Sequence, residues 1–170
     1  MSIKAFAKTS ALTAVAAFSL AVSQASAQDL VSFADFRIVE TSTDGAEQLI
    51  ERDSVRPGEV IEYSLMHSNN AEDELNGLSI FAPVPDGVTL ALGTEFSSIP
   101  AEFEIQADID PEAEGLEWSS LPAMRTVLAE DGTKYEEPVP ADAIAAVRWN
   151  LESALQGGET ARNSYRVVVN

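Results

Sequence analysis

The chain has 170 residues, a formal net charge of −18 at pH 7 and no cysteine. An acidic surface repels nucleic acid and anionic lipid over about a Debye length, so we expect neither as a partner. The absence of cysteine excludes disulfides and the lipid-modified cysteine of a lipoprotein. We interpret the acidity as a source of colloidal solubility, with cation binding or repulsion from acidic envelope polymers as the alternative.

The N-terminus has the pattern of a secretory signal peptide. Lys4 and Lys8 precede an apolar run over residues 11–22, which ends in the small residues Ala25-Ser26-Ala27, and the sequence therefore predicts a leader over residues 1–27. The run is shorter than the roughly 20 apolar residues that span a bilayer, and no later segment comes close. We therefore predict no transmembrane segment.

Residues 28–170 are then expected to form one exported domain of the periplasm or cell surface. Loss of the leader removes two lysines and no acidic residue, which lowers the formal charge from −18 to −20. A domain of about 140 residues buries close to 70% of the surface that its unfolded chain exposes, and it needs no disulfide bond to be stable.

The alternation of apolar and polar residues, broken by glycine and proline turns, predicts an all-β domain. No segment outside the leader keeps a helical period over ten or more residues, which favours an antiparallel sandwich of about seven to nine strands. In chain order, strands are expected over residues 30–39, 61–68, 78–82, 88–92, 101–109, 124–128, 133–135, 147–151 and 165–169, with a single helical turn over residues 141–146.

One face of these strands should supply the hydrophobic core. The strand over residues 61–68 is the clearest case, and in the strand over residues 101–109 the apolar residues alternate with an almost wholly acidic face. The expected core residues are Phe36, Ile38, Ile61, Tyr63, Leu65, Ile80, Val88, Phe103, Ile105, Val147, Trp149, Tyr165, Val167 and Val169.

Two similar turn sequences, Arg56-Pro57-Gly58-Glu59 and Gln156-Gly157-Gly158-Glu159, each precede an alternating strand. We interpret their similarity as shared turn chemistry and not as a duplicated unit.

Several motifs occur together in a fixed order: Pro57-Gly58-Glu59-Val60-Ile61-Glu62-Tyr63, Ser68-Asn69-Asn70, Pro83-Val84-Pro85-Asp86-Gly87-Val88, Val147-Arg148-Trp149 and Gln156-Gly157-Gly158-Glu159. In these motifs the chain resembles the bacterial "conserved repeat" immunoglobulin-like family, the eleventh domain of unknown function. The resemblance implies an exported Ig-like β-sandwich of the kind built into cell-surface and envelope proteins. Asn69-Asn70-Ala71 replaces the family's Asn-x-Gly, and Gln156-Gly157 its Pro-Gly, which points to a divergent single-domain member.

Few residues suggest chemistry. His67 is the only histidine and is in phase with Ile61, Tyr63 and Leu65, so we expect a partly buried, hydrogen-bonded ring and not a catalytic base. No nucleophile motif such as Gly-x-Ser-x-Gly is present, and one histidine without cysteine disfavours zinc. We therefore predict no enzyme activity and no bound cofactor.

Two ligand sites are left open. Asp108, Asp110, Glu112 and Glu114 carry alternate carboxylates that could gather around Ca²⁺, although the spacing matches no complete calcium loop and a solvated loop is the better interpretation. Trp118 follows a glycine-containing loop and could stack on a sugar or another ligand, whereas Trp149 is expected in the core.

The sequence thus predicts a non-enzymatic structural or interaction module whose partners are other envelope or surface proteins, with a calcium- or carbohydrate-binding module as the alternative. The strand over residues 30–39 could pair in its own sheet or with a neighbouring chain, and we expect pairing in its own sheet.

Overall fold

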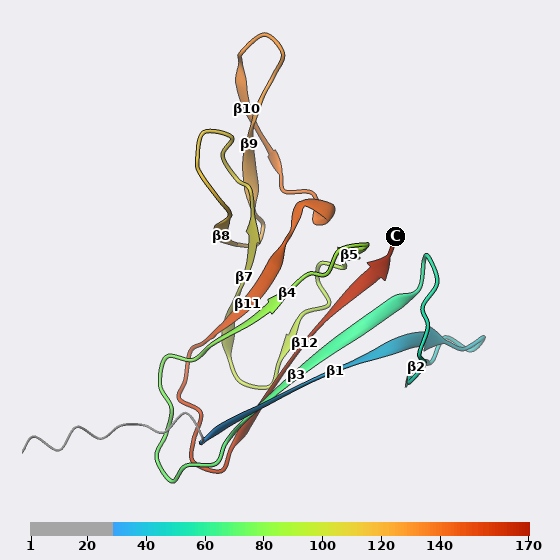
Figure 1. Cartoon of the computed structure of the whole chain (residues 1–170), viewed down its shortest axis with the longest axis vertical. Coiled ribbons are helices and arrows are strands. Elements are labelled where there is room, and N and C mark those ends of the chain that lie inside the picture. The colour runs from blue at the N-terminus through green and yellow to red at the C-terminus, as the bar shows by residue number, and fades with distance from the viewer. Residues whose placement is uncertain (1–28) are drawn as a thin grey trace, which may run out of the picture.

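The computed structural model describes residues 29–170 (Figure 1). The predicted leader, residues 1–27, lies outside this range. Among the described residues no helix is both long and apolar enough to cross a membrane. A 3₁₀ turn over Ala141–Ala143 lies where a helical turn was expected. The strands are β1 (Leu30–Thr41), β2 (Glu47–Ile50), β3 (Val60–Asn69), β4 (Ser79–Pro83), β5 (Val88–Leu90), β6 (Phe96–Ser97), β7 (Ala101–Ala107), β8 (Glu117–Ser120), β9 (Met124–Leu128), β10 (Lys134–Pro138), β11 (Ala146–Leu151) and β12 (Thr160–Val169).

The strands form two main antiparallel sheets, which confirms an all-β, two-layer fold. The larger sheet has the order β2-β1-β3-β12-β5, with β6 also paired to β12, and the smaller sheet has the order β4-β11-β7-β8. Strands β9 and β10 form a separate hairpin that extends beyond the smaller sheet (Figure 1). In the same view the strands of the two sheets converge at the lower end and diverge toward the upper end.

The described part of the chain contains twelve strands, more than the seven to nine expected. The unexpected ones are β2, β6 and β8, each of four residues or fewer. Such short segments contain too few alternations to stand out from the surrounding loops. β2 returns beside β1 after a turn at Gly45, whose φ is +86°, and pairs with residues 38–41.

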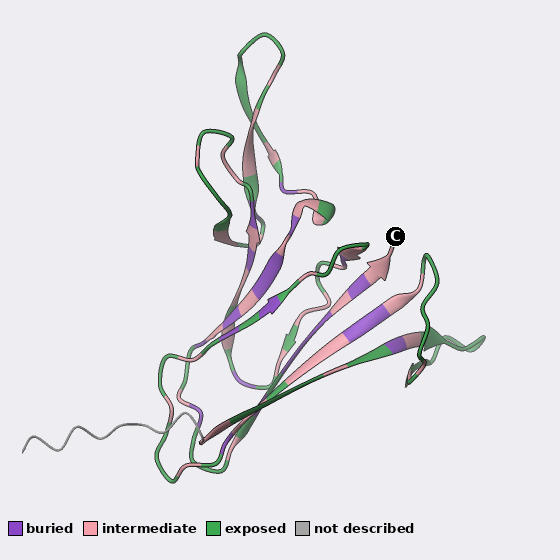
Figure 2. Ribbon diagram, in the orientation of Figure 1, coloured by how far each residue is buried: buried purple, intermediate pink, exposed green. Residues whose placement is uncertain are grey.

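The core lies between the two sheets, and Figure 2 shows buried segments in strands of both sheets. It is centred on aromatic side chains. The ring of Trp149 on β11 lies 5.3 Å from Phe103 in its own sheet and 6.1 Å from Tyr165 in the larger sheet. Tyr165 in turn stacks on Tyr63 at 5.2 Å. We call Phe103, Trp149, Tyr165 and Tyr63 the aromatic row. Separations of this size are favourable for aromatic pairs, so the row links the two layers directly.

Most of the expected core residues are confirmed. Those that are buried are Ile38, Ile61, Ile80, Ile105, Val147, Trp149, Tyr165 and Val167. Those that are half-buried against the core are Tyr63, Leu65, Val88, Phe103 and Val169.

The prediction for Phe36 is wrong, because its side chain is 49% exposed. Phe36 does lie on the same face of the larger sheet as Tyr63, with ring centroids 6.2 Å apart. The smaller sheet does not cover it, however. Between β1 and β4 the layers are separated by an apolar groove of about 180 Å³, lined among others by Ala34, Tyr63 and Pro83. The alternation therefore identified the correct face but not how far the opposite sheet extends.

The two similar turns share one construction. In the first, the Glu59 carboxylate accepts the backbone N–H of Arg56 at 2.7 Å, and in the second the Glu159 carboxylate accepts that of Gln156 at 2.9 Å. Each turn also has a glycine with positive φ, +84° at Gly58 and +77° at Gly158, which favours glycine. The prediction of shared turn chemistry is confirmed.

The end of the sandwich near the second turn is closed by a buried asparagine. The amide nitrogen of Asn69 donates to the carbonyls of Asp73 at 2.8 Å and Leu155 at 3.0 Å, and its oxygen accepts the N–H of Ala71 at 3.0 Å. A Cβ at Gly157 would lie 2.4 Å from the Glu72 carbonyl oxygen, so only glycine fits there. Asn69 therefore fixes the loop after β3 against the segment before β12.

The hydroxyl of Tyr165 provides a test of the contact between the layers. It donates to the Pro83 carbonyl at the end of β4, 2.8 Å away, and burial and the neighbouring Tyr63 raise its pKa, so it stays a donor across the physiological range. We expect Tyr165→Phe to lower the free energy of unfolding by about 1 kcal/mol, the usual net value of one hydrogen bond. Urea denaturation measures this change. Tyr135→Phe on the exposed hairpin is the control and should change nothing, and equal stabilities of both variants would contradict the role of this bond.

Candidate interaction surface

The outer face of the smaller sheet carries a cluster of two aromatic rings and an arginine. Phe81 on β4 is paired in register with Arg148 on β11, and Trp118 on β8 is paired with Gln106 on β7. Phe81 is exposed and Trp118 is half-buried. We call Phe81, Trp118 and Arg148 the aromatic–arginine cluster.

The cluster has the geometry of favourable aromatic contacts. The guanidinium carbon of Arg148 lies 4.3 Å from the centre of the Trp118 ring, and the ring of Phe81 meets Trp118 edge-on at 5.9 Å and 78°. A cation this close to a ring face is attracted by the ring quadrupole, by roughly 0.5–1 kcal/mol at an exposed site. One face of the indole is therefore already occupied by Arg148.

Glu104 on β7 fixes the position of Arg148. Its carboxylate accepts the Nε–H of Arg148 at 2.6 Å and the side-chain amide of Asn150 at 2.5 Å, and Asn150 is bonded in turn to Ser79. The hydrogen bond from Arg148 is the main cause that lowers the pKa of Glu104, against an opposing effect of burial. The arginine is thus held in place before any partner binds.

The sequence analysis identified one member of this cluster and missed two. Trp118 was expected to be accessible because it follows a loop, and the structure places it on the solvent side of its sheet. Phe81 and Arg148 were not singled out. Their outward direction could have been inferred, because each is the neighbour of a residue expected in the core, Ile80 or Trp149.

His67 lies on the inner face of β3, opposite Ser32 of β1 and Ala161 of β12. Its ring is partly buried, and burial lowers its pKa. Its Nδ1 atom is buried without a hydrogen-bond partner among residues 29–170, so the expected hydrogen bond at this atom is not formed. The surroundings favour a neutral packing residue.

The four acidic residues proposed for calcium lie in the loop after β7. The Asp110 carboxylate accepts the backbone N–H of Glu112 at 2.9 Å, and Glu112 forms an ion pair with Lys134 at 2.8 Å. Asp108, Glu112 and Glu114 are exposed. Within residues 29–170 no three His, Cys, Asp or Glu side chains are grouped in a way that could hold a metal ion. Calcium binding by this loop stays an untested alternative to the solvated loop that the sequence favours.

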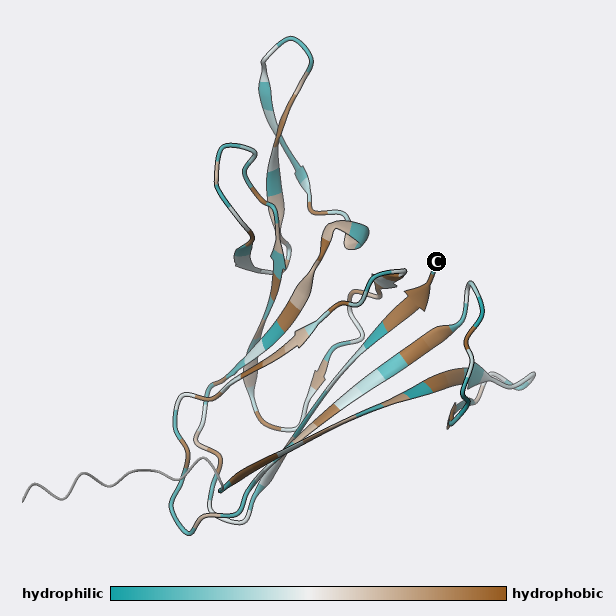
Figure 3. Cartoon of the chain, in the orientation of Figure 1, coloured by the Kyte–Doolittle hydropathy of each residue, from teal (hydrophilic) through white to brown (hydrophobic). Residues whose placement is uncertain are grey.

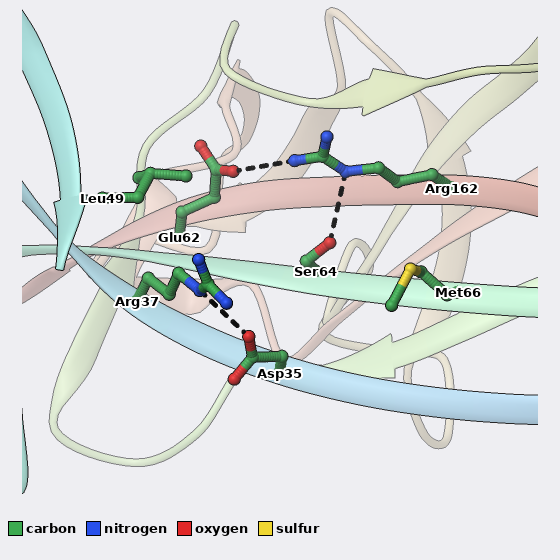
Figure 4. Close-up of a pocket in the computed structure, with 7 residues that line it drawn as sticks. All are labelled: Asp35, Arg37, Leu49, Glu62, Ser64, Met66 and Arg162. Atoms are coloured by element: carbon green, nitrogen blue, oxygen red, sulfur yellow. Dashed lines mark hydrogen bonds and ion pairs between the residues drawn. The ribbon is translucent and has the colours of Figure 1, made fainter. Parts of the chain in front are cut away.

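A shallow depression of about 340 Å³ lies on the outer face of the larger sheet (Figure 4). Its charged groups are paired with one another: Arg162 with Glu62 at 3.4 Å and Arg37 with Asp35 at 3.1 Å. Arg166, beside the depression, also pairs with Glu62 at 3.0 Å. These pairs satisfy the charges within the fold, so the depression does not present an unpaired group to a ligand.

Comparison with protein-family models, with curated proteins and with solved structures found no match to this chain.

The ion pair beneath the cluster can be tested through its pH dependence. At neutral pH we expect Glu104→Gln to lower the free energy of unfolding by about 1–2 kcal/mol, because Arg148 loses a charged hydrogen-bond partner. Since folding lowers the pKa of Glu104, its stabilisation is complete above the unfolded value of 4.5 and is lost as the pH falls through the folded value. The difference from the parent chain should therefore shrink in acid.

Denaturation from pH 7 down to about pH 3 measures this difference. Glu102→Gln is the control, because Glu102 is an exposed acid of the same strand whose side chain, within the part of the chain that the structure describes, accepts only the Ser120 hydroxyl. A pH-independent difference for Glu104→Gln would contradict the charge interaction.

Proposed function

We propose that the chain is an exported, non-enzymatic Ig-like module that makes protein–protein contacts in the periplasm or at the cell surface. The observation that carries this proposal is the aromatic–arginine cluster on the outer face of the smaller sheet. Its members face solvent, and Glu104 holds its arginine in place at 2.6 Å.

The chemistry of the cluster favours a protein partner. Tryptophan and arginine are enriched among residues that dominate binding energy, and aromatic residues and arginine are enriched in interface cores. A fixed arginine loses little side-chain entropy when a partner binds. Arg148 already covers one face of Trp118, which is the kind of face a sugar ring would need for stacking.

Two observations support the proposed relation to the Ig-like conserved-repeat family. The fold has two antiparallel layers, and both Gly-Glu turns quoted for the resemblance have the same hydrogen-bond pattern. The strand order differs from that of an Ig constant domain, because the last strand, β12, pairs with β3 and β5. In an Ig constant domain the last strand lies in the sheet of strands C and F instead. We therefore propose a member with altered connectivity.

Export is supported by the leader pattern in residues 1–27 and by a fold that has no cysteine to oxidise. The partner is accordingly expected among envelope or surface proteins.

The proposed contact surface can be tested by crosslinking in the native envelope. A photoreactive amino acid at position 81 lies within the cluster and should give a discrete crosslinked product. We expect Trp118→Ala to reduce this product by about tenfold or more, because truncation of a hot-spot residue costs roughly 2 kcal/mol or more.

The matched control carries the photoreactive residue at Phe96, an equally exposed aromatic of the larger sheet. Equal crosslinking at both positions, or a product at position 81 that is insensitive to Trp118→Ala, would refute the cluster as the contact surface.

Thermal melting with millimolar Ca²⁺ or a panel of glycans tests the alternative function. A ligand that binds only the folded chain must raise the melting temperature, and under our proposal we expect no rise. A rise with glycans that Trp118→Ala abolishes would instead assign carbohydrate binding. A rise with Ca²⁺ that Asp110→Asn abolishes would assign the acidic loop.

A further inference from the structure

Strand β1 has an open edge over most of its length. On one side it pairs continuously with β3, from Leu30 opposite Asn69 to Val39 opposite Val60. On the other side β2 pairs only with residues 38–41. Residues 30–37 therefore have no neighbouring strand on their outer side among the described residues.

The backbone groups of four residues point toward this open edge. The Asp29 carbonyl accepts the N–H of Asn70 at 2.7 Å, so position 29 directs its groups toward β3. The register is continuous and alternate residues of an antiparallel strand direct both groups to opposite sides. Leu30, Ser32, Ala34 and Phe36 therefore direct theirs outward. In agreement, the N–H of Phe36 is bonded to the neighbouring Asp35 carboxylate at 2.8 Å and not to β3.

Over residues 30–34 this edge lacks the features that normally prevent strand addition, and the charged residues Asp35 and Arg37 follow. Residues 30–34 include no charge and no proline, and Val31, Phe33 and Phe36 are exposed, Phe33 to 56%. The first half of β1 is largely exposed in Figure 2, and its start is hydrophobic in Figure 3. Natural proteins usually protect an edge with charges, proline or a bulge. An unprotected edge of this length indicates a surface that is covered in use.

We propose that β1 pairs antiparallel with β1 of a second copy of this chain, about a two-fold axis at Phe33. In this register Leu30 lies opposite Phe36 of the second copy, and Ser32 lies opposite Ala34 of the second copy. All four outward-directed residues then exchange backbone hydrogen bonds, because the set is symmetric about position 33. The N–H of Phe36 gives up its bond to the Asp35 carboxylate for one to Leu30 of the second copy. The two larger sheets become one continuous sheet.

The side chains at the two ends of the proposed register are complementary. Asp29 comes beside Arg37 of the second copy at one end, and the reciprocal pair forms at the other. Arg37 already contacts Asp35 at 3.1 Å and Glu51 at 3.3 Å, and its guanidinium has five donors to share. At the centre the uncharged Phe33 meets its own copy. A two-fold interface requires such self-complementarity, which an unrelated partner strand would match only by chance.

The dimer also covers exposed apolar surface beside the groove between the sheets. Phe36 lies on the groove side of β1, against Tyr63. Leu30 of the second copy would lie directly beside Phe36 on that face. An edge-to-edge contact of this kind is small, and we expect a weak dimer.

The first test measures the oligomeric state as a function of concentration. The full-length sequence is expressed, and the N-terminus of the purified protein is determined by mass spectrometry. Sedimentation velocity should then show a monomer–dimer equilibrium, and Phe33→Lys should weaken it by about tenfold or more, because two lysines would meet at the axis. The matched control, Phe96→Lys, changes an equally exposed aromatic at another strand and should leave the equilibrium unchanged. A parent chain that stays monomeric up to millimolar concentration, or equal effects of the two variants, would overturn the proposal.

The second test reads the register directly and does not depend on a destabilising change. The chain has no cysteine, so Phe33→Cys introduces a single thiol. In the proposed register residue 33 forms a non-hydrogen-bonded pair with its own copy, with Cα atoms about 4.5 Å apart, within disulfide range. Val31→Cys is the control, because its copy would be four residues along the strand, about 13 Å away. Rapid oxidation of Phe33→Cys alone to a covalent dimer supports the register, and equal oxidation of both variants, or of neither, refutes it.

Discussion

The structure depends on the contact of Trp149 with aromatic rings of both sheets. The chain has no disulfide, and its layers are held by apolar packing in which Trp149 lies between Phe103 and Tyr165. A ring of this size removes a large apolar area from water and lies at favourable angles to its neighbours. The Tyr165 hydroxyl adds a directional bond to the end of β4, which fixes the smaller sheet relative to the larger one.

The aromatic row formed by Phe103, Trp149, Tyr165 and Tyr63 also explains where the two sheets of the sandwich are not in contact. It ends at Tyr63 on β3, and the next residue across the sheet, Phe36 on β1, has no ring of the smaller sheet to cover it. The smaller sheet ends at β4, so β1 extends past the limit of its partner layer. The exposed groove therefore follows from the unequal width of the two sheets, whereas the open edge of β1 follows from the short length of β2, which pairs only with residues 38–41.

Local alternation predicted the fold class, most strand positions and the inward direction of residues such as Ile61, Ile105 and Val147. It did not predict the exposure of Phe36, because the width of the opposite sheet is set by pairings between distant segments. Similarly, Trp118 was recognisable from its loop, but its contact with Arg148 and Phe81 depends on the order β4-β11-β7-β8. No local pattern encodes that order. The strands β2, β6 and β8, which the sequence did not predict, are too short to show an alternation of apolar and polar residues.

Positive and negative side chains have different surroundings in this molecule. Arg148, Arg162 and Arg166 form ion pairs with acids on neighbouring strands, and Glu62 is shared between two of them. Arginines bound in this way are positioned by the fold, whereas many of the acidic residues face water and produce the net charge. Arg148 is bound in this way to Glu104 and in addition stacks on the indole of Trp118.

The two proposed surfaces belong to different sheets, and this separation affects binding. The aromatic–arginine cluster lies on the outer face of the smaller sheet, whereas the β1 edge belongs to the larger sheet, so pairing of two copies through β1 does not use Trp118 or Arg148. Phe81 also lines the groove beside Ala34 of β1. A dimer would then present two identical contact sites at a fixed spacing. When a partner offers repeated copies of its own site, the second contact becomes intramolecular and the overall affinity can rise well above that of one site.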